Sequence, residues 1–340
     1  MKAVRIDAFG SAEAALRVVM DEPVPTPAPG EILVKVEATS VNPIDCAVRE
    51  GYGAEFFLSA GLIRLPLIPG RDVAGTVEAV GPGVTTFRPG QSVYAGATNF
   101  ATAEFIAIPA AWAAPMPGAL SFVQAAALPY AALTAWSALV DTVGLTERTT
   151  VGRRVVVPRG AGGVGSVTIQ LMKAWGAHVA SICSTRNVEL VRSLGADEVV
   201  DYLRADFTHV LADFDVAFDT AFDTEAGLLS ILKTGADATY VSIVSPRLRL
   251  IDQYGLEEGA ARGDELLRTR KVEQALLGRR YDWAFMQPNG KALASVGALV
   301  EAGLIRPLID RVYPIEDIVE AHRYCETRQA QGKIIVQIAR

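Results

Sequence analysis

Cysteine is scarce in this chain, and its cysteines lie far apart. They are Cys46, Cys183 and Cys325, among 340 residues. An odd number of widely spaced thiols excludes a disulfide framework and fits a reducing compartment. The same scarcity excludes a cysteine-rich lobe that binds structural zinc, because such a lobe needs four ligands close together.

Basic runs and long apolar runs are also missing. The net charge is −6 without any lysine- or arginine-rich run, so we expect no nucleic acid and no anionic membrane surface as a partner. The first residues, MKAVRIDAFG, lack the apolar core of a signal peptide, and no segment runs 18 residues without a polar interruption. A soluble, cytoplasmic protein with no membrane span is the expectation. Half of the residues are hydrophobic, enough for the two domains that this length predicts.

A glycine-rich stretch follows a β-branched run near the middle of the chain. Residues 153–175 read RRVVVPRGAGGVGSVTIQLMKAW, the pattern of a strand, a tight turn and a helix. Gly160, Gly162 and Gly165 stand in the G-x-G-x-x-G order of a dinucleotide site. They permit the turn, the approach of a pyrophosphate and the close packing of the helix. The predicted cofactor contacts of this turn are Gly160, Gly162, Gly163, Val164 and Gly165.

The helix after this turn is expected to bury one face against a sheet. That packing fixes the positive end of the helix beside the phosphates. The alternative is a plain glycine turn that binds nothing, and the flanking strand and helix argue against it. The residues expected on the buried face are Val164, Val167, Leu171 and Trp175.

The first 125 residues read as short strands and tight turns, which indicates a β-rich domain. Candidate strands at 3–6 and 31–38 flank a proline-spaced loop. Residues 52–66 read as an unusually apolar loop, which could line a pocket, contact a partner or simply be buried at one end.

After residue 153 strands alternate with helical patterns, which predicts a doubly wound parallel sheet and an α/β fold. A charged helical segment at 257–280 is expected to cover one face of that sheet. The six candidate strands are 155–157, 178–182, 198–201, 215–218, 239–244 and 281–285. The rest of the chain reads as helices at 291–302 and 315–326, an extended stretch at 305–312 and a strand at 333–338.

Seven motifs, in this order and spacing, resemble the medium-chain dehydrogenase/reductase superfamily and, within it, the zinc-independent quinone oxidoreductase branch. The resemblance covers essentially the whole chain. It implies a GroES-like β-rich catalytic domain at 1–125 and 288–340, and a Rossmann NADPH-binding domain at 126–287. The stretch RRYDWAFMQPNG is similar to the sub-branch of reticulon-interacting mitochondrial proteins and chloroplast-envelope quinone oxidoreductases. The motifs are VNPID (41–45), IPGRDVAGTVEAVG (68–81), FRPGQSV (87–93), LTAW (133–136), GAGGVG (160–165), LGADEVVDY (194–202) and GKIIVQI (332–338).

NADPH is the expected cofactor. In NAD sites a carboxylate ends the second strand, where this chain reads CSTRN at 183–187. The Ser184 hydroxyl and the Arg186 guanidinium suit the 2′-phosphate of NADPH, which an acid would repel. The alternative is that this segment only caps the next helix. The resemblance implies further cofactor contacts at Thr134, Tyr202, Ser242, Ile243, Val244, Phe285 and Lys333, the last on the wall of the substrate cleft.

No metal site is expected. By the same resemblance, zinc-dependent relatives carry a cysteine where this chain has Asn42 and a His-Glu pair where it has Arg71 and Asp72. These residue types cannot replace the ligands in that geometry. The histidines are each expected to be structural or exposed rather than ligands; they are His178, His209 and His322.

Without a metal, alcohol oxidation is disfavoured and reduction of an activated acceptor remains feasible. A small apolar quinone or enone can take a hydride if a hydrogen-bond donor steadies its oxygen. Asn42 and Tyr52 are the candidate catalytic donors, but Asn42 could only bond local backbone and Tyr52 could only pack in its loop. The tyrosine that the branch carries two residues after Asp45 is Ala47 here, which indicates a roomier pocket.

Two other functions stay open: an NADPH-dependent double-bond reductase of enones, alkenals or enoyl thioesters, and a non-catalytic NADPH-binding protein. A homodimer is expected as well. The strand at 281–285 is predicted to end the sheet, and an unpaired apolar edge favours pairing with a second chain.

Overall fold

The chain folds around two separate main sheets, each in its own compact unit. The structure, a computed structural model, describes residues 1–235 and 238–338. Unit 1 comprises Met1–Leu133, Pro288–Gly303 and Pro307–Arg340, and unit 2 comprises Thr134–Gln287 and Leu304–Arg306. Both chain ends therefore belong to unit 1. The domain limits given above stay a prediction.

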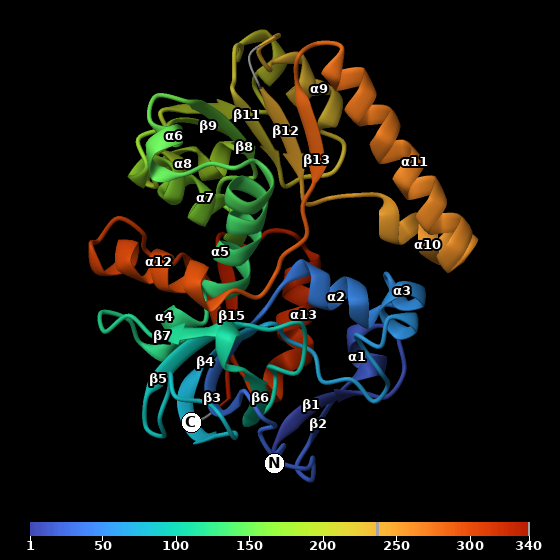
Figure 1. The fold of residues 1–340 in the computed structure, drawn as a ribbon, viewed down its shortest axis with the longest axis vertical. Coiled ribbons are helices and arrows are strands. Elements are labelled where there is room, and N and C mark those ends of the chain that lie inside the picture. Colours follow the sequence, from blue (N-terminus) through green and yellow to red (C-terminus); the bar gives the residue numbers. More distant parts are fainter. Residues whose placement is uncertain (236–237, 339–340) are drawn as a thin grey trace. The chain divides into compact units, whose positions relative to one another are not determined.

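The elements are labelled in chain order in Figure 1. Those of unit 1 are β1 (Ala3–Ile6), α1 (Ala12–Ala15), β2 (Leu16–Val19), β3 (Glu31–Val41), α2 (Pro43–Arg49), α3 (Ala54–Ser59), β4 (Asp72–Val80), β5 (Ser92–Gly96), β6 (Phe105–Pro109), η1 (Ala110–Trp112), β7 (Ala113–Pro115), α4 (Phe122–Ala125), α12 (Gly290–Glu301), β14 (Ile309–Pro314), η5 (Ile315–Asp317), α13 (Ile318–Glu326) and β15 (Lys333–Gln337). Helix α5 (Pro129–Trp136) begins in unit 1 and ends in unit 2. Those of unit 2 are η2 (Ser137–Thr142), α6 (Glu147–Thr150), β8 (Arg154–Pro158), α7 (Gly163–Ala174), β9 (His178–Cys183), η3 (Thr185–Asn187), α8 (Val188–Ser193), β10 (Glu198–Asp201), η4 (Phe207–His209), β11 (Val216–Asp219), α9 (Glu225–Ser230), β12 (Thr239–Ser242), α10 (Arg247–Tyr254), α11 (Leu256–Ala275) and β13 (Arg280–Trp283).

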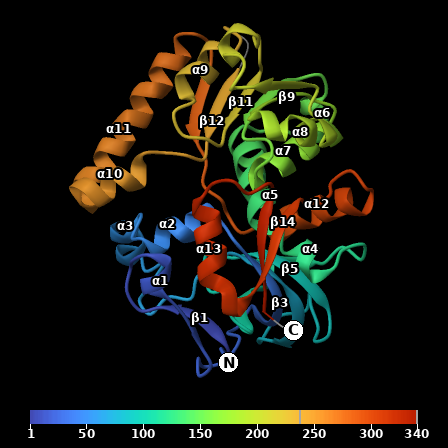
Figure 2. The ribbon, with the colours of Figure 1, turned by 180° about the vertical axis from the view of Figure 1, so that it is seen from behind.

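Strand β3 is the centre of unit 1. Among the described residues the main sheet has seven strands in the order β14-β15-β3-β4-β5-β7, with β6 also paired to β3. Along β3 only the middle alternates, with the exposed Lys35 between the buried Val34 and Val36, and the last four residues of the strand are all buried. Figure 2 shows α13 packed against β14, β15 and β3. The turn-rich N-terminal sequence predicted a β-rich unit, and the family resemblance implied its GroES-like fold.

The sequence predicted an apolar loop at 52–66. The structure differs, because this segment contains the short helix α3. The helix begins after Gly53, whose φ of 71° lies in the left-handed region that glycine adopts without strain. Ile63 is buried in the core of unit 1, whereas Leu58 and Leu62 stay exposed.

Unit 2 holds the doubly wound parallel sheet that the sequence predicted. In the described part of this unit six parallel strands lie in the order β10-β9-β8-β11-β12-β13. Helix α7 packs on β8 and β9, and the charged helix α11 lies along β13 at the sheet edge (Figure 1). Of the four residues expected on the buried face of α7, three are buried, but Val164 in the first turn is only half-buried.

One stretch, Phe122–Thr142, has the length and the mean hydropathy, 1.3, of a candidate membrane span. However, 72% of its apolar window is buried within the protein, as in the core helix of a folded domain. This stretch is therefore weak evidence for a span.

His322, in unit 1, is the most deeply buried of the three histidines. Its side chain lies in α13, 1% exposed, with Nδ1 3.4 Å from the Cys46 sulfur. Burial lowers the pKa of His322 to about 3, and the positive charge of Arg49 acts in the same direction. The imidazole is therefore neutral at neutral pH and serves packing.

We expect His322 to make the protein sensitive to acid. Below about pH 6.5 the unfolded chain protonates this residue, whereas the folded chain keeps it neutral down to about pH 3. Its contribution to stability is thus complete above pH 6.5 and decreases as the pH falls. Between pH 6.5 and pH 5 the free energy of unfolding should drop by about 1.6 kcal/mol through this residue. Urea unfolding of His322→Gln should show a correspondingly smaller pH slope, and equal slopes in both proteins would contradict a neutral His322.

Candidate functional site

The glycine-rich turn of unit 2 joins β8 to α7. Arg159 turns the chain with a φ of 58°, and Gly162 is the N-cap of α7. The N–H groups of the first turn, Gly163 to Gly165, have no acceptor inside the helix. Because Gly162 has no side chain to cap them, they are available to an anion at the positive end of the helix dipole.

The three motif glycines are required for different reasons. A Cβ atom at Gly160 would lie 2.2 Å from Ser181 Oγ, and one at Gly165 would lie 2.4 Å from the Arg159 carbonyl oxygen. At Gly162 the nearest atom would be 3.3 Å away, again at the Arg159 carbonyl. Gly160 and Gly165 therefore permit the contact of strand, turn and helix, whereas Gly162 keeps room beside the helix end. The turn fits the pyrophosphate of a dinucleotide.

This difference can be tested with two alanine variants. Gly162→Ala should lower NADPH affinity about ten- to a hundredfold, through lost hydrogen bonds to the phosphates, and should change stability by less than about 1 kcal/mol. Gly165→Ala should lower affinity and also destabilise unit 2 by about 1–3 kcal/mol, because its methyl group overpacks the turn. Fluorescence titration with NADPH and thermal unfolding measure the two effects. Unchanged affinity in Gly162→Ala would remove the pyrophosphate from this turn.

The residues predicted to hold the adenosine end lie at the paired ends of two strands. Cys183 ends β9 opposite Asp201, which ends β10, and the Tyr202 N–H donates to the Cys183 carbonyl at 3.1 Å. Ser184 follows β9 and accepts a hydrogen bond from Asn187 at 3.2 Å. The remaining two predicted residues of this group, Arg186 and Tyr202, are exposed.

Asp201 is a carboxylate that the sequence reasoning did not consider. It stands beside the Ser184 segment only because β10 pairs with β9, so the residues after β9 do not show it. Its oxygens accept from Thr185 Oγ1 at 2.6 Å and from the Leu203 N–H at 3.0 Å, and Arg204 lies 3.5 Å away. The protein's own groups thus engage the acid that would otherwise repel a 2′-phosphate.

The other predicted cofactor residues of unit 2 follow the same carboxyl edge of the sheet. Ser242 ends β12, its Oγ accepts from the Val244 N–H at 3.0 Å, and the Ile243 N–H donates to the Asp219 carbonyl. Phe285 follows β13 and is 47% exposed. Ligands of open parallel sheets bind outside this edge. Thr134 is buried in α5 and was assigned by resemblance alone.

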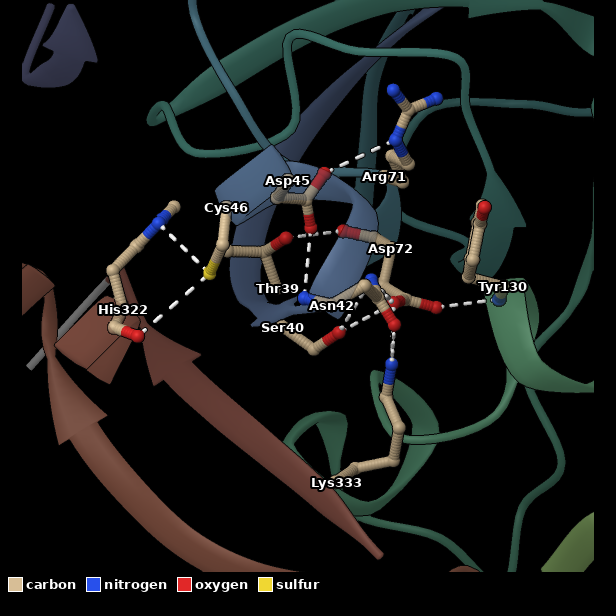
Figure 3. A network of polar contacts seen from close by, with 10 residues as sticks. All are labelled: Thr39, Ser40, Asn42, Asp45, Cys46, Arg71, Asp72, Tyr130, His322 and Lys333. Carbon is tan, nitrogen blue, oxygen red and sulfur yellow. Dashed lines mark hydrogen bonds and ion pairs between the residues drawn. The ribbon is translucent and has the colours of Figure 1, made fainter. Parts of the chain in front are cut away.

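A second group of polar side chains lies at one end of the sheet in unit 1 (Figure 3). Asn42 follows β3, Asp72 begins β4 and Lys333 begins β15, and all three side chains are at least 95% buried. Ser40, near the end of β3, and the backbone of Tyr130 in α5 complete the group. We call these residues, Ser40, Asn42, Asp72, Tyr130 and Lys333, the lysine cluster.

Asp72 is the common acceptor of the lysine cluster. Its Oδ1 accepts from the Tyr130 N–H at 2.6 Å. Its Oδ2 accepts from the Ser40 hydroxyl, from Asn42 Nδ2 at 3.0 Å and from Lys333 Nζ at 3.1 Å. Lys333 also donates to Asn42 Oδ1. Because an ammonium only donates and a carboxylate only accepts, these contacts fix which side of the Asn42 amide is oxygen and which is nitrogen.

A second ion pair lies beside the lysine cluster. Arg71 Nε is 3.1 Å from Asp45 Oδ1, and Asp45 Oδ2 accepts from the Asn42 backbone N–H at 2.8 Å. Burial raises the pKa of the Asp45 carboxyl, and the Arg71 charge opposes that shift. With Asp72 and Lys333, the region holds two basic and two acidic side chains, so its buried charges balance.

The Asn42 amide makes two kinds of contact. It bonds the side chains of Ser40, Asp72 and Lys333, and as the N-cap of α2 it also forms a capping box with Asp45. Tyr52 is half-buried and follows α2. Burial is the main cause that raises the pKa of Tyr130 to about 12, and Tyr52 contributes to the same shift. The sequence missed Ser40 and Tyr130, because only the fold brings β3 and the start of α5 to Asp72.

The histidines are dispersed. His178 Nε2 lies 2.7 Å from Glu198, His209 is exposed and His322 is in the core. Within residues 1–235 and 238–338 no group of three or more His, Cys, Asp or Glu side chains is arranged to hold a metal.

Comparison with known proteins identifies the family. Residues 28–118 match the alcohol dehydrogenase GroES-like domain, and residues 194–336 match the family described as zinc-binding dehydrogenase. The chain belongs to the medium-chain dehydrogenase/reductase superfamily, in its quinone oxidoreductase branch.

Particular relatives agree with this placement. The chain is 38% identical to the mitochondrial NAD(P)H oxidoreductase RTN4IP1 of Mus musculus, over 91% of this chain and 82% of that one. It is 31% identical to the chloroplast envelope quinone oxidoreductase homolog of Arabidopsis thaliana, over 99% and 98%. The solved quinone oxidoreductase of Coxiella burnetii superposes with a TM-score of 0.82 at 29% identity, over 100% and 99%.

The cytoplasmic location predicted from the sequence is wrong by this comparison. The mouse relative and its counterparts are named as mitochondrial proteins. The prediction rested on the lack of a signal peptide and of disulfide-forming cysteines, and a reducing interior is not unique to the cytoplasm.

Proposed function

We propose that this protein is an NADPH-dependent reductase that transfers hydride to a small apolar quinone, or another activated carbonyl acceptor, without zinc. One observation carries the proposal. Asn42 and Asp72 stand where zinc-dependent relatives have ligands, and both bond the ammonium of Lys333. The Lys333 ammonium therefore already occupies the point on which the Asn42 and Asp72 side chains converge. The names of the mouse and Arabidopsis relatives support the reaction class.

The bound nicotinamide would supply the hydride. The first-turn N–H groups of α7 bind the pyrophosphate, and Ser184 and Arg186 bind the 2′-phosphate. Asn42 and Tyr52 are the proposed catalytic side chains, and the lysine cluster fixes the amide of Asn42. The acceptor gains two electrons and one hydrogen at an electron-poor position, and water supplies the proton that completes the reduced product.

The test is a panel of acceptors with the purified protein. Quinones should oxidise NADPH, primary alcohols should not reduce NADP⁺, and a chelator should leave the quinone rate unchanged. Elemental analysis should find less than stoichiometric zinc. A zinc lost together with activity would overturn the metal-free mechanism. Turnover of enones alone would assign a double-bond reductase, and no turnover with any acceptor would leave an NADPH-binding protein.

Coenzyme preference is expected to depend on Arg186. Arg186→Ala should weaken NADPH binding about ten- to a hundredfold, the value of one charge-assisted pair with phosphate of about 1.5–3 kcal/mol, and should leave NADH binding nearly unchanged. Arg192→Ala is the control, because that exposed arginine pairs with Glu189 on α8. Titration of each protein with both coenzymes measures the effect. Equal affinity of the unmodified protein for NADPH and NADH would refute the assignment.

We also propose a homodimer through β13. This strand ends the six-stranded sheet, and its outer edge would carry unpaired N–H and C=O groups. Pairing with β13 of a second chain would continue the sheet across a twofold axis.

A further inference from the structure

We propose that the Lys333 ammonium takes the place of the metal ion of zinc-dependent relatives and donates a hydrogen bond to the acceptor oxygen that becomes negatively charged on hydride transfer. This inference rests on the proposed function. It transfers the role of hydrogen-bond donor to the acceptor oxygen from Asn42 to Lys333, and it leaves Asn42 and Asp72 to position the ammonium.

The hydrogen bonds of Lys333 leave one donor available. An ammonium carries three N–H groups. Among the residues that the structure describes, Nζ donates to two acceptors, Asn42 Oδ1 and Asp72 Oδ2. Figure 3 shows the side chain extending from β15 with Nζ toward these two residues. With no third acceptor for Nζ among residues 1–235 and 238–338, one N–H is left for an incoming oxygen.

Asn42 is a poorer donor than the sequence indicated. Its Nδ2 carries two hydrogens, and they point to Asp72 Oδ2 at 3.0 Å and to Ser40 Oγ at 3.3 Å. Donation to an acceptor would break one of these bonds, whereas Lys333 need break none. The amide is therefore better suited to hold the lysine than to contact the acceptor.

The position of the lysine cluster favours a site over a structural ion pair. It lies where β3 ends and where β4 and β15 begin, so it borders the connecting segments, which carry most functional side chains. A buried ion pair adds little to stability compared with apolar packing, because both charges lose their hydration. A fixed cation in a site of low dielectric, by contrast, stabilises a developing oxyanion strongly.

The step balances without another reactant. The hydride brings two electrons to the electron-poor carbon or oxygen of the acceptor, and the displaced electron pair comes to rest on the acceptor oxygen. Lys333 lowers the energy of that oxyanion through a charge-assisted hydrogen bond. Water then supplies one proton, at oxygen for a quinone or at the α-carbon for an enone. Lys333 contributes only a hydrogen bond and transfers no proton in this step.

Lys333→Met is the primary test, since methionine keeps the length of the side chain and removes the charge. It should lower kcat with the best quinone of the panel about a hundred- to a thousandfold, while the Kd for NADPH changes less than about threefold. Lys2→Met is the matched control, because Lys2 pairs with Glu316 in the same unit, and it should keep the unmodified rate. A lysine that only binds cofactor would instead raise the Kd and leave kcat unchanged, and that result would overturn the proposal.

Chemical rescue separates catalysis from folding. In Lys333→Ala, methylammonium chloride should restore part of the lost kcat, and sodium chloride at the same ionic strength should not. If removal of the lysine unfolds the protein, Asp72→Asn combined with Lys333→Met removes both charges and should still show the loss in kcat. Failure of amine rescue in a variant that binds NADPH would overturn the role of Lys333.

The two proposals fail in different ways. If none of the acceptors in the panel allows the unmodified protein to oxidise NADPH, the proposed function and the role of Lys333 both fail. If it is active and Lys333→Met is equally active, only the role of Lys333 fails.

Discussion

A buried ammonium needs a carboxylate beside it, and in this chain that need joins the ends of three strands. Lys333 and Asp72 are 261 residues apart in sequence, and β3 brings them together. It pairs with β15 through Val41 and Ile334 and with β4 through Ala38 and Ala74. A slip of one residue in either pairing would turn one charge to the opposite face of the sheet and leave the other unpaired. The register of this sheet is thus tied to the charge balance of the lysine cluster.

Local signals made unit 2 predictable. A parallel strand buried on both faces is a short β-branched run, and the glycines after β8 are set by close contacts within one strand, turn and helix. Each predicted strand therefore falls within two residues of an observed one. The charged helix α11 was also visible, because its length and composition exclude a strand. On the predicted buried face of α7, only Val164 is less buried than expected, because the first turn of the helix extends past the packed face.

The lysine cluster could not be predicted in the same way. Its charged members, Asp72 and Lys333, are far from Asn42 in sequence, and the pairing of β3 with β4 and β15 brings them together. The sequence did place Asn42 and Lys333 near the substrate, through resemblance, but not in contact. Asp201 shows the same limit in unit 2. This carboxylate ends β10 and lies beside the predicted cofactor segment that follows β9. Only the pairing of β9 with β10 reveals this proximity.

The proposed exchange of a metal for a lysine would also set the direction of the chemistry. Zinc takes an alcohol oxygen as a ligand and lowers its pKa, so the metal helps both to remove a proton and to reverse that step. An ammonium has no vacant coordination position and can only donate hydrogen bonds. It stabilises an oxygen that is already gaining charge, as in a quinone or an enone that receives hydride, but it does little to ionise a neutral alcohol. Under this proposal, a chain that places Lys333 between Asn42 and Asp72 would reduce activated acceptors and would oxidise alcohols poorly.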